Sequence, residues 1–308
     1  MSVSGIHHVT AIAGHAQENV DFYAGVLGLR LVKRTVNFDD PLTYHLYYGT
    51  ETGAPGTILT FFAWPNANHG RVGSGQVNAI ALSVPEGSLP WWQERFKSRR
   101  VTHDLPLKRF GEDVLPFQDN DGLQLELVPV NEARPAWKGG GVPEECAIRG
   151  VHCVTAGEEG YEMTAALLSE TLLFTRIGQE GNRFRYRAGE GHGMIDVLCT
   201  PDGPHARGGA GAVHHIAWRV PDDADQLAWR KTLISAGMNV SPVLDRQYFH
   251  SIYFREPGGV LFELATDEPG FATDEPEQTL GENLKLPPWL EGARQQIEAG
   301  LEPITLPQ

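Results

Sequence analysis

The chain of 308 residues contains few cysteines and no long apolar run. Its three cysteines form no close pair, which argues against a disulfide framework and predicts a reducing, cytoplasmic location. No apolar run approaches the roughly 20 residues that span a bilayer. Residues 1–8 lack the basic and apolar regions of a signal peptide. We therefore expect no membrane as a partner.

Basic residues are also scarce, with 25 Lys and Arg against 39 Asp and Glu, so the formal net charge is −14 at pH 7. A chain this acidic is repelled by phosphate backbones, and we expect no nucleic acid as a partner. No Ser-His-Asp order, phosphate-binding glycine loop or Cys-x-x-Cys zinc pair stands out. The 12 histidines are the remaining candidates for chemistry.

One pattern occurs four times along the chain: a short strand, a helix, and further strands that end in an apolar run. The four opening strands are expected at 5–10, 76–82, 150–155 and 212–218. The helices are expected at 16–27, 89–99, 161–173 and 222–236. The closing strands are expected at 56–62, 121–127, 193–198 and 258–264. Each unit therefore has the order βαβββ, and the fold class is α+β.

The segment 131–149 contains Pro135, a run of three glycines and Pro143, which makes it the best candidate for a boundary. We predict an N-terminal domain of two modules at 1–130, a linker at 131–149, a C-terminal domain of two modules at 150–267, and a tail at 268–308. Within the tail, 287–299 is expected to form an amphipathic helix, packed on the outside or on a partner subunit.

Aligning the four units places candidate metal ligands in two columns. In the opening strands, one column contains His8, Asn78, Cys153 and His215. In the closing strands, the comparable column contains Glu126, Asp196 and Glu263 in the second, third and fourth units, and the first unit has no carboxylate there.

Two ways of pairing the units give different sites. If the first unit pairs with the second and the third with the fourth, neither pair has two His and one carboxylate. If the first pairs with the fourth, His8, His215 and Glu263 come together, which is the ligand set of non-haem Fe(II) oxygenases. Glu263 supports this pairing, because an unpaired carboxylate in its apolar run would be costly to bury. Glu126 is instead expected to pair with a buried arginine or a water.

Several segments resemble a known family. They are Gly-Ile-His-His-Val-Thr at 5–10, Asp-Asp-Pro at 39–41 with Tyr-His-Leu-Tyr-Tyr at 44–48, Val-His-His-Ile-Ala at 213–217, and Asp-Arg-Gln-Tyr-Phe-His-Ser-Ile-Tyr-Phe at 245–254. Over about residues 5–266 the chain resembles the vicinal oxygen chelate superfamily, which includes glyoxalases, bleomycin-resistance proteins and extradiol dioxygenases. It resembles most the ring-cleaving dioxygenases of the hydroquinone 1,2-dioxygenase type. The resemblance implies two glyoxalase-like domains of curved mixed sheets.

The resemblance also implies the cofactor and the site. Fe(II) would be bound by His8, His215 and Glu263, a ligand set that also suits Mn(II). The pocket around the small aromatic substrate and O2 would include catalytic residues His214, Arg246 and Tyr253, together with His7 and Thr10. In these roles, Arg246 or His214 stabilises negative charge that develops on oxygen, and Tyr253 positions a substrate hydroxyl or moves its proton. The implied activity is ring cleavage by a homo-oligomer, in quinone detoxification or aromatic catabolism.

Other functions are compatible with the fold. Glyoxalase-like isomerases need a second carboxylate, which the first closing strand lacks. Thiol transferases of this fold are usually short chains of two units. A catechol extradiol dioxygenase remains an alternative, although such enzymes normally take the first His from the third unit, where Cys153 stands. A non-catalytic binding module for aromatic compounds is a further alternative, with a cavity lined by Phe61, Phe62, Trp64, Trp218 and Phe249.

Overall fold

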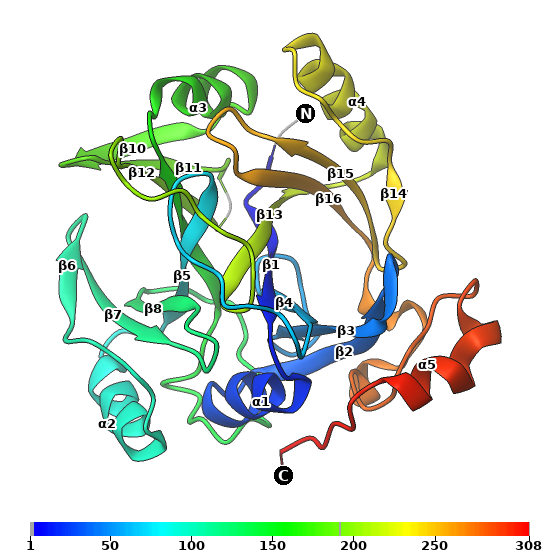
Figure 1. Cartoon of the computed structure of the whole chain (residues 1–308). Coiled ribbons are helices and arrows are strands. Elements are labelled where there is room, and N and C mark those ends of the chain that lie inside the picture. The colour runs from blue at the N-terminus through cyan, green and yellow to red at the C-terminus, as the bar shows by residue number, and fades with distance from the viewer. Residues whose placement is uncertain (1–2, 191, 308) are drawn as a thin grey trace.

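The computed structural model describes residues 3–190 and 192–307, and it contains the four expected modules. The first and second modules comprise β1 (Ile6–Ala13), α1 (Ala16–Val20), η1 (Asp21–Val26), β2 (Arg30–Asn37), β3 (Asp40–Gly49) and β4 (Ile58–Ala63), then β5 (Gln76–Val84), α2 (Leu89–Arg99), β6 (Leu107–Arg109), β7 (Glu112–Gln118) and β8 (Gln124–Pro129). The third and fourth comprise β9 (Gly150–Glu158), α3 (Glu162–Ala166), η2 (Leu167–Thr171), β10 (Thr175–Glu180), β11 (Arg183–Arg187) and β12 (Met194–Cys199), then β13 (Ala212–Val220), α4 (Asp223–Ser235), β14 (Leu244–Asp245), β15 (Phe249–Arg255) and β16 (Leu261–Pro269). Figure 1 shows the helices α1 to α4 on the outside of the strands.

The helices lie where the pattern of apolar residues and end signals predicts them. Asp222 caps α4 by accepting a hydrogen bond from the backbone N–H of Asp225, and the helix ends just before Gly237. The first and third helices continue as π-helical turns, η1 and η2, so both reach the expected length. Gly28 follows the first helix at φ +70°, and a Cβ there would lie 2.5 Å from Val142, so the position requires glycine.

The strands form two eight-stranded sheets. The first has the order β14-β15-β16-β13-β1-β4-β3-β2, and the second has the order β10-β11-β12-β9-β5-β8-β7-β6. The first sheet thus joins the first and fourth modules through the antiparallel pair β1–β13, and the second joins the second and third modules through β5–β9. In Figure 1 the central strands β1, β13 and β5 lie side by side, and the two sheets curl away from them.

This arrangement confirms the α+β class and the curved mixed sheets of the glyoxalase-like fold. It also confirms the pairing of the first module with the fourth, on which the predicted metal site depends. Each sheet combines modules from both halves of the chain. The division at 131–149 into an N-terminal and a C-terminal domain stays a prediction.

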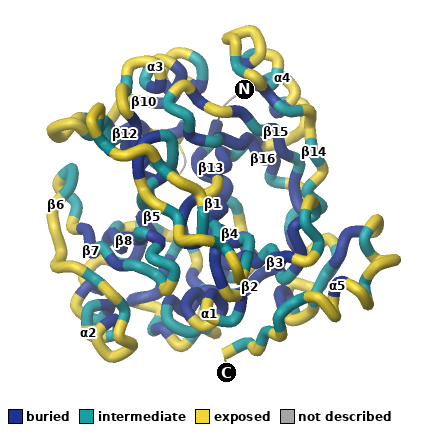
Figure 2. The backbone as a smooth tube through the Cα atoms, in the orientation of Figure 1, coloured by how far each residue is buried: buried dark blue, intermediate teal, exposed yellow. Residues whose placement is uncertain are grey.

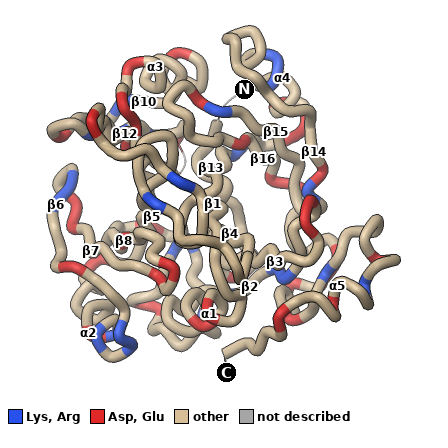
Figure 3. Tube along the Cα trace, in the orientation of Figure 1, with Lys and Arg blue, Asp and Glu red and all other residues tan. Residues whose placement is uncertain are grey.

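The core lies between the sheets and the helices that cover them, as the dark blue interior of Figure 2 shows. Its largest fully buried side chains include Trp92, Trp218 and Trp229. The acidic residues are distributed over many elements of the trace rather than gathered on one (Figure 3). Among the described residues, no helix is both long and apolar enough to cross a membrane.

The tail packs along the outer strand β2. It contains the 3-10 turns η3 (Phe271–Thr273), η4 (Glu277–Thr279) and η5 (Glu291–Ala293), followed by α5 (Arg294–Gly300). The helix is therefore shorter than the expected 287–299, because it begins only at Arg294 after the 3-10 turn η5. Lys33 of β2 is fully buried and ion-paired with Asp274 and Glu275 of the tail, at 2.6 and 2.9 Å. The tail thereby covers an edge strand that would otherwise be open to pairing.

Candidate metal centre and active site

Three predicted ligands converge on the concave face of the first sheet. The Nε2 atoms of His8 and His215 are 3.3 Å apart, and Oε2 of Glu263 is 3.4 Å from the first and 2.9 Å from the second. All three side chains are buried, and candidate ligand atoms of the three lie within 4.8 Å of one another. They come from β1, β13 and β16, which are consecutive in the sheet.

The register of the strands explains this convergence. His8 lies opposite Ala217 on β13, Ala217 lies opposite Glu263 on β16, and Glu263 lies opposite Tyr253 on β15. Residues opposite one another in neighbouring strands share a face of the sheet. The small side chain of Ala217 leaves open the space between His8 and Glu263, so the two can approach each other across β13.

The surroundings of the triad fit a divalent metal ion. Oε2 of Glu263 is buried and has no hydrogen-bond partner, whereas its Oε1 accepts a short hydrogen bond from the Ser251 hydroxyl. An orphaned buried carboxylate oxygen is costly unless a cation binds it. Although burial alone would raise the pKa of Glu263, the neighbouring His8 and His215 hold it well below its ordinary value, so the group is a carboxylate.

Each histidine ligand is held by the histidine before it in the sequence. Nδ1 of His8 lies 2.9 Å from Nδ1 of His7, and Nδ1 of His215 lies 2.7 Å from Nδ1 of His214. A ligand that presents a lone pair at Nε2 must carry its proton at Nδ1, where it donates to the neighbouring ring. Burial, and then the neighbouring His8, lowers the pKa of His7 to about 3, so this ring is neutral and can accept.

A cavity of about 350 Å³ opens over the triad, within the range of small-molecule sites. Its polar lining includes His214, Arg246 and Tyr253 of the predicted site, and its aromatic lining is Phe38, Phe62, Trp64 and Phe249. Two of the aromatics considered for a binding cavity, Phe61 and Trp218, are instead buried in the core. His7 and Thr10 are buried and are not among the residues that line this cavity.

Arg246 and Tyr253 form a pair at one side of the cavity. Nε–H of Arg246 donates to the Tyr253 hydroxyl oxygen at 3.3 Å, and Nη1 contacts Asp39 of the β2–β3 turn at 3.3 Å. Burial, more than the nearby Glu263, raises the pKa of Tyr253, so the phenol keeps its proton. Burial alone would lower the pKa of Arg246, but Tyr253 and Asp39 keep it raised and the guanidinium charged. The pair offers a positive charge and a free O–H to an oxygen beside the triad.

Sequence reasoning gave no role to two other polar residues of the cavity, His45 and Tyr47 of β3. Strand alternation places both on one face of β3, and both belong to the segment 44–48 that carries the resemblance. Their alternation with apolar residues is equally typical of a half-buried strand. The sequence therefore contained the signal but could not separate it from packing.

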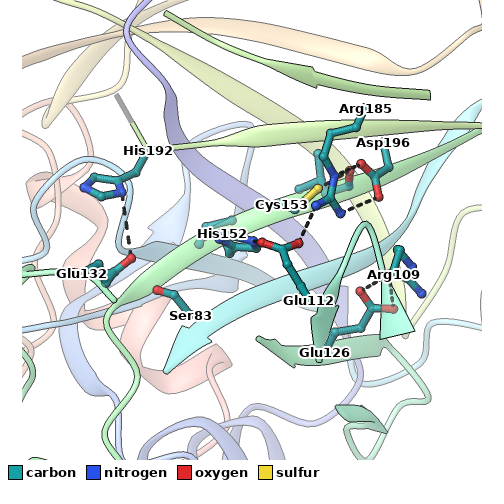
Figure 4. A network of polar contacts seen from close by, with 12 residues as sticks. Ser83, Arg109, Glu112, Glu126, Glu132, His152, Cys153, Arg185, His192 and Asp196 are labelled. Atoms are coloured by element: carbon teal, nitrogen blue, oxygen red, sulfur yellow. Dashed lines mark hydrogen bonds and ion pairs between the residues drawn. The ribbon is translucent and has the colours of Figure 1, made fainter. Parts of the chain in front are cut away.

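In the second sheet, arginines bind the carboxylates that correspond to Glu263 (Figure 4). Glu126 accepts two hydrogen bonds from Arg109 at 2.9 and 2.7 Å, which confirms the expected pairing with an arginine. Asp196 is bound by Arg185 at 2.7 and 3.0 Å, and Cys153 is buried beside them. Within residues 3–190 and 192–307, the triad of the first sheet is the one group with metal-ligand geometry.

Comparisons with known proteins place this architecture in a family. Residues 5–127 and 160–264 match the Glyoxalase/Bleomycin resistance protein/Dioxygenase superfamily, and the chain belongs to it. The chain is 52% identical to the protein named putative ring-cleaving dioxygenase MhqO of Bacillus subtilis (strain 168), over 97% of this chain and 96% of that protein. It is 38% identical to the chlorohydroquinone/hydroquinone 1,2-dioxygenase of Sphingobium indicum, over 96% and 95% of the two chains. A crystal structure of a putative dioxygenase from Bacillus subtilis aligns with a TM-score of 0.96 at 50% identity, covering 100% of this chain and 99% of that one.

Proposed function

We propose that this protein is an Fe(II)-dependent ring-cleaving dioxygenase that inserts both atoms of O2 into a hydroquinone-type substrate. The observation that carries the proposal is the buried triad of His8, His215 and Glu263 at the wall of an aromatic cavity. Two His and one carboxylate leave coordination positions for a substrate oxygen and for O2. The likeness to a hydroquinone 1,2-dioxygenase supports the choice of substrate.

The protein groups around the triad have roles that follow from their charge and position. Fe(II), when bound, supplies Lewis acidity and exchanges electrons with O2. The charged guanidinium of Arg246 favours the phenolate form of a bound hydroxyl and stabilises negative charge that develops on oxygen. Tyr253 keeps its proton and donates it in a hydrogen bond to the same oxygen. Phe38, Phe62, Trp64 and Phe249 exclude water and contact the faces of an aromatic ring.

Oxygen consumption tests the proposal directly. Anaerobically purified protein loaded with Fe(II) is mixed with hydroquinone, chlorohydroquinone, methylhydroquinone or catechol, and O2 uptake is recorded. We expect uptake with a hydroquinone that disappears in His215→Ala and persists in Cys153→Ala, a matched variant at the corresponding position of the second sheet. Uptake with catechol alone would overturn the hydroquinone assignment. No uptake with any substrate would support a binding module instead. Cytoplasmic location and a homo-oligomeric state stay predictions.

A further inference from the structure

His45 and Tyr47 belong to a chain of hydrogen bonds that runs from the cavity into the sheet. The Tyr47 hydroxyl lies 2.9 Å from Nδ1 of His45, and Nε2 of His45 lies 2.7 Å from the Thr60 hydroxyl. Thr60 is in turn 2.9 Å from the hydroxyl of Thr10. Both His45 and Tyr47 line the cavity, and neither is needed to hold the metal. The chain fixes the orientation of both side chains.

These two residues and the Arg246–Tyr253 pair lie on strands that flank the ligand-bearing strands in the order of the sheet. The sheet order β15-β16-β13-β1-β4-β3 places Tyr253 on β15 and His45 and Tyr47 on β3, with the ligand-bearing strands between them. All four residues line the same cavity. Because Arg246 also contacts Asp39 of the β2–β3 turn, the curled sheet brings both sets of residues around one cavity. An aromatic ring with one oxygen beside Tyr253 can therefore turn its far end toward β3.

Arg246 on the one hand, and His45 and Tyr47 on the other, suit substrate oxygens in different protonation states. Arg246 is charged and only donates hydrogen bonds, which suits an ionised oxygen. Burial lowers the pKa of His45 and raises that of Tyr47, so both are neutral. If Tyr47 donates to His45, its oxygen is free to accept from a ligand; if His45 donates to Tyr47, the Tyr47 O–H is free to donate. A residue that can either accept or donate a hydrogen bond suits a neutral hydroxyl, because a hydroxyl can also do both.

We propose that Tyr47, oriented by His45, is the subsite that recognises the second, para hydroxyl of the substrate. This inference rests on the proposed function for the identity of the ring that enters the cavity. Tyr47 is then a specificity-determining residue, and His45 is a positioning residue that acts through it. The subsite selects benzene-1,4-diols over phenols that carry a single hydroxyl.

Equilibrium binding without oxygen tests the subsite apart from catalysis. Hydroquinone and phenol are titrated anaerobically into the Fe(II)-loaded protein by calorimetry, for the wild type, Tyr47→Phe and His45→Gln. A single good hydrogen bond to the para hydroxyl predicts that the wild type prefers hydroquinone by about tenfold. Tyr47→Phe should remove this preference and leave phenol affinity unchanged, and His45→Gln should reduce it.

A matched control is Tyr48→Phe, which removes a buried tyrosine hydroxyl one residue along the same strand. That hydroxyl donates to Asn19 on the other face of β3, so the variant should keep the preference. A tenfold preference that survives in Tyr47→Phe would overturn the subsite, whatever the reaction. Loss of the preference in a protein that consumes no O2 would support the subsite while refuting the proposed activity. Failure of the wild type to prefer hydroquinone would also overturn the subsite.

Discussion

Glu158 is a buried carboxyl group that should make the stability of the fold depend on pH. It lies at the end of β9, is fully buried, and neither of its carboxylate oxygens has a hydrogen-bond partner. The nearby Glu256 is better supported, because it accepts from the Thr164 hydroxyl at 2.6 Å and from the backbone of Gly258 and Val260. Burial, and then the charge of Glu256, raises the pKa of Glu158 from 4.5 to about 8.

The sign of the effect follows from this raised pKa. A carboxyl group with a higher pKa in the folded state takes up a proton on folding, so its contribution is fully present below pH 4.5 and is lost as pH rises to about 8. At about 1.4 kcal/mol for each pKa unit, the loss between pH 5 and pH 9 is about 4 kcal/mol. Glu158→Gln keeps the shape of the side chain and cannot ionise. The free energy of unfolding of the variant, relative to the wild type, should therefore increase by about 4 kcal/mol between pH 5 and pH 9.

Urea unfolding at pH 5, 7 and 9 measures the difference, with metal removed so that metal binding does not contribute. The free energy of unfolding of Glu158→Gln relative to wild type should rise steadily with pH. Glu159→Gln, at the exposed neighbouring position, should run parallel to the wild type. If Glu158→Gln also runs parallel, Glu158 is ionised or solvated in the fold and the reasoning is wrong.

Three further predictions concern packing and the metal site. Lys33→Met leaves Glu275 buried without its ion pair and should lower the free energy of unfolding by about 3–5 kcal/mol in urea; a loss under about 1 kcal/mol would contradict this. Ala217→Val fills the space between the ligands and should reduce metal content by mass spectrometry, with the circular dichroism spectrum unchanged; full metal content would refute the account of the register. Ser251→Ala removes the hydrogen bond to Glu263 and should weaken metal binding about 10- to 100-fold in competition with a chelator; unchanged affinity would show that Ser251 does not orient the ligand.

The fold and the triad were predictable because both depend on a repeat. Because the four modules share one pattern, residues in the same column of their alignment lie on the same face of the opening strands. His8 and His215 could therefore be compared by position. Only the pairing of the first module with the fourth brings together two His and one carboxylate. The structure pairs these two modules through β1 and β13. Glu126 likewise lies in an apolar run and is expected to pair with a buried arginine or a water, and Arg109 is the partner in the structure.

Contacts between distant strands could not be predicted in the same way. Periodicity gives the face of a residue, but it does not give its register against a neighbouring strand. The approach of His45 to Thr60 depends on the β3–β4 register, and the approach of Thr60 to Thr10 depends on β1–β4. The ion pairs of Lys33 depend on a tail that returns to β2 over 240 residues later in the chain.

The fate of O2 tests the central claim most directly. Fe(II)-loaded protein is supplied with hydroquinone under ¹⁸O2, and the product is analysed by mass spectrometry. A ring-cleaving dioxygenase breaks one carbon–carbon bond of the ring and places both labelled atoms in one open-chain product. His215→Ala should form none of this product, and Cys153→Ala should form as much as the wild type. An open-chain product without any label, or conversion of hydroquinone to unlabelled quinone, would contradict the account.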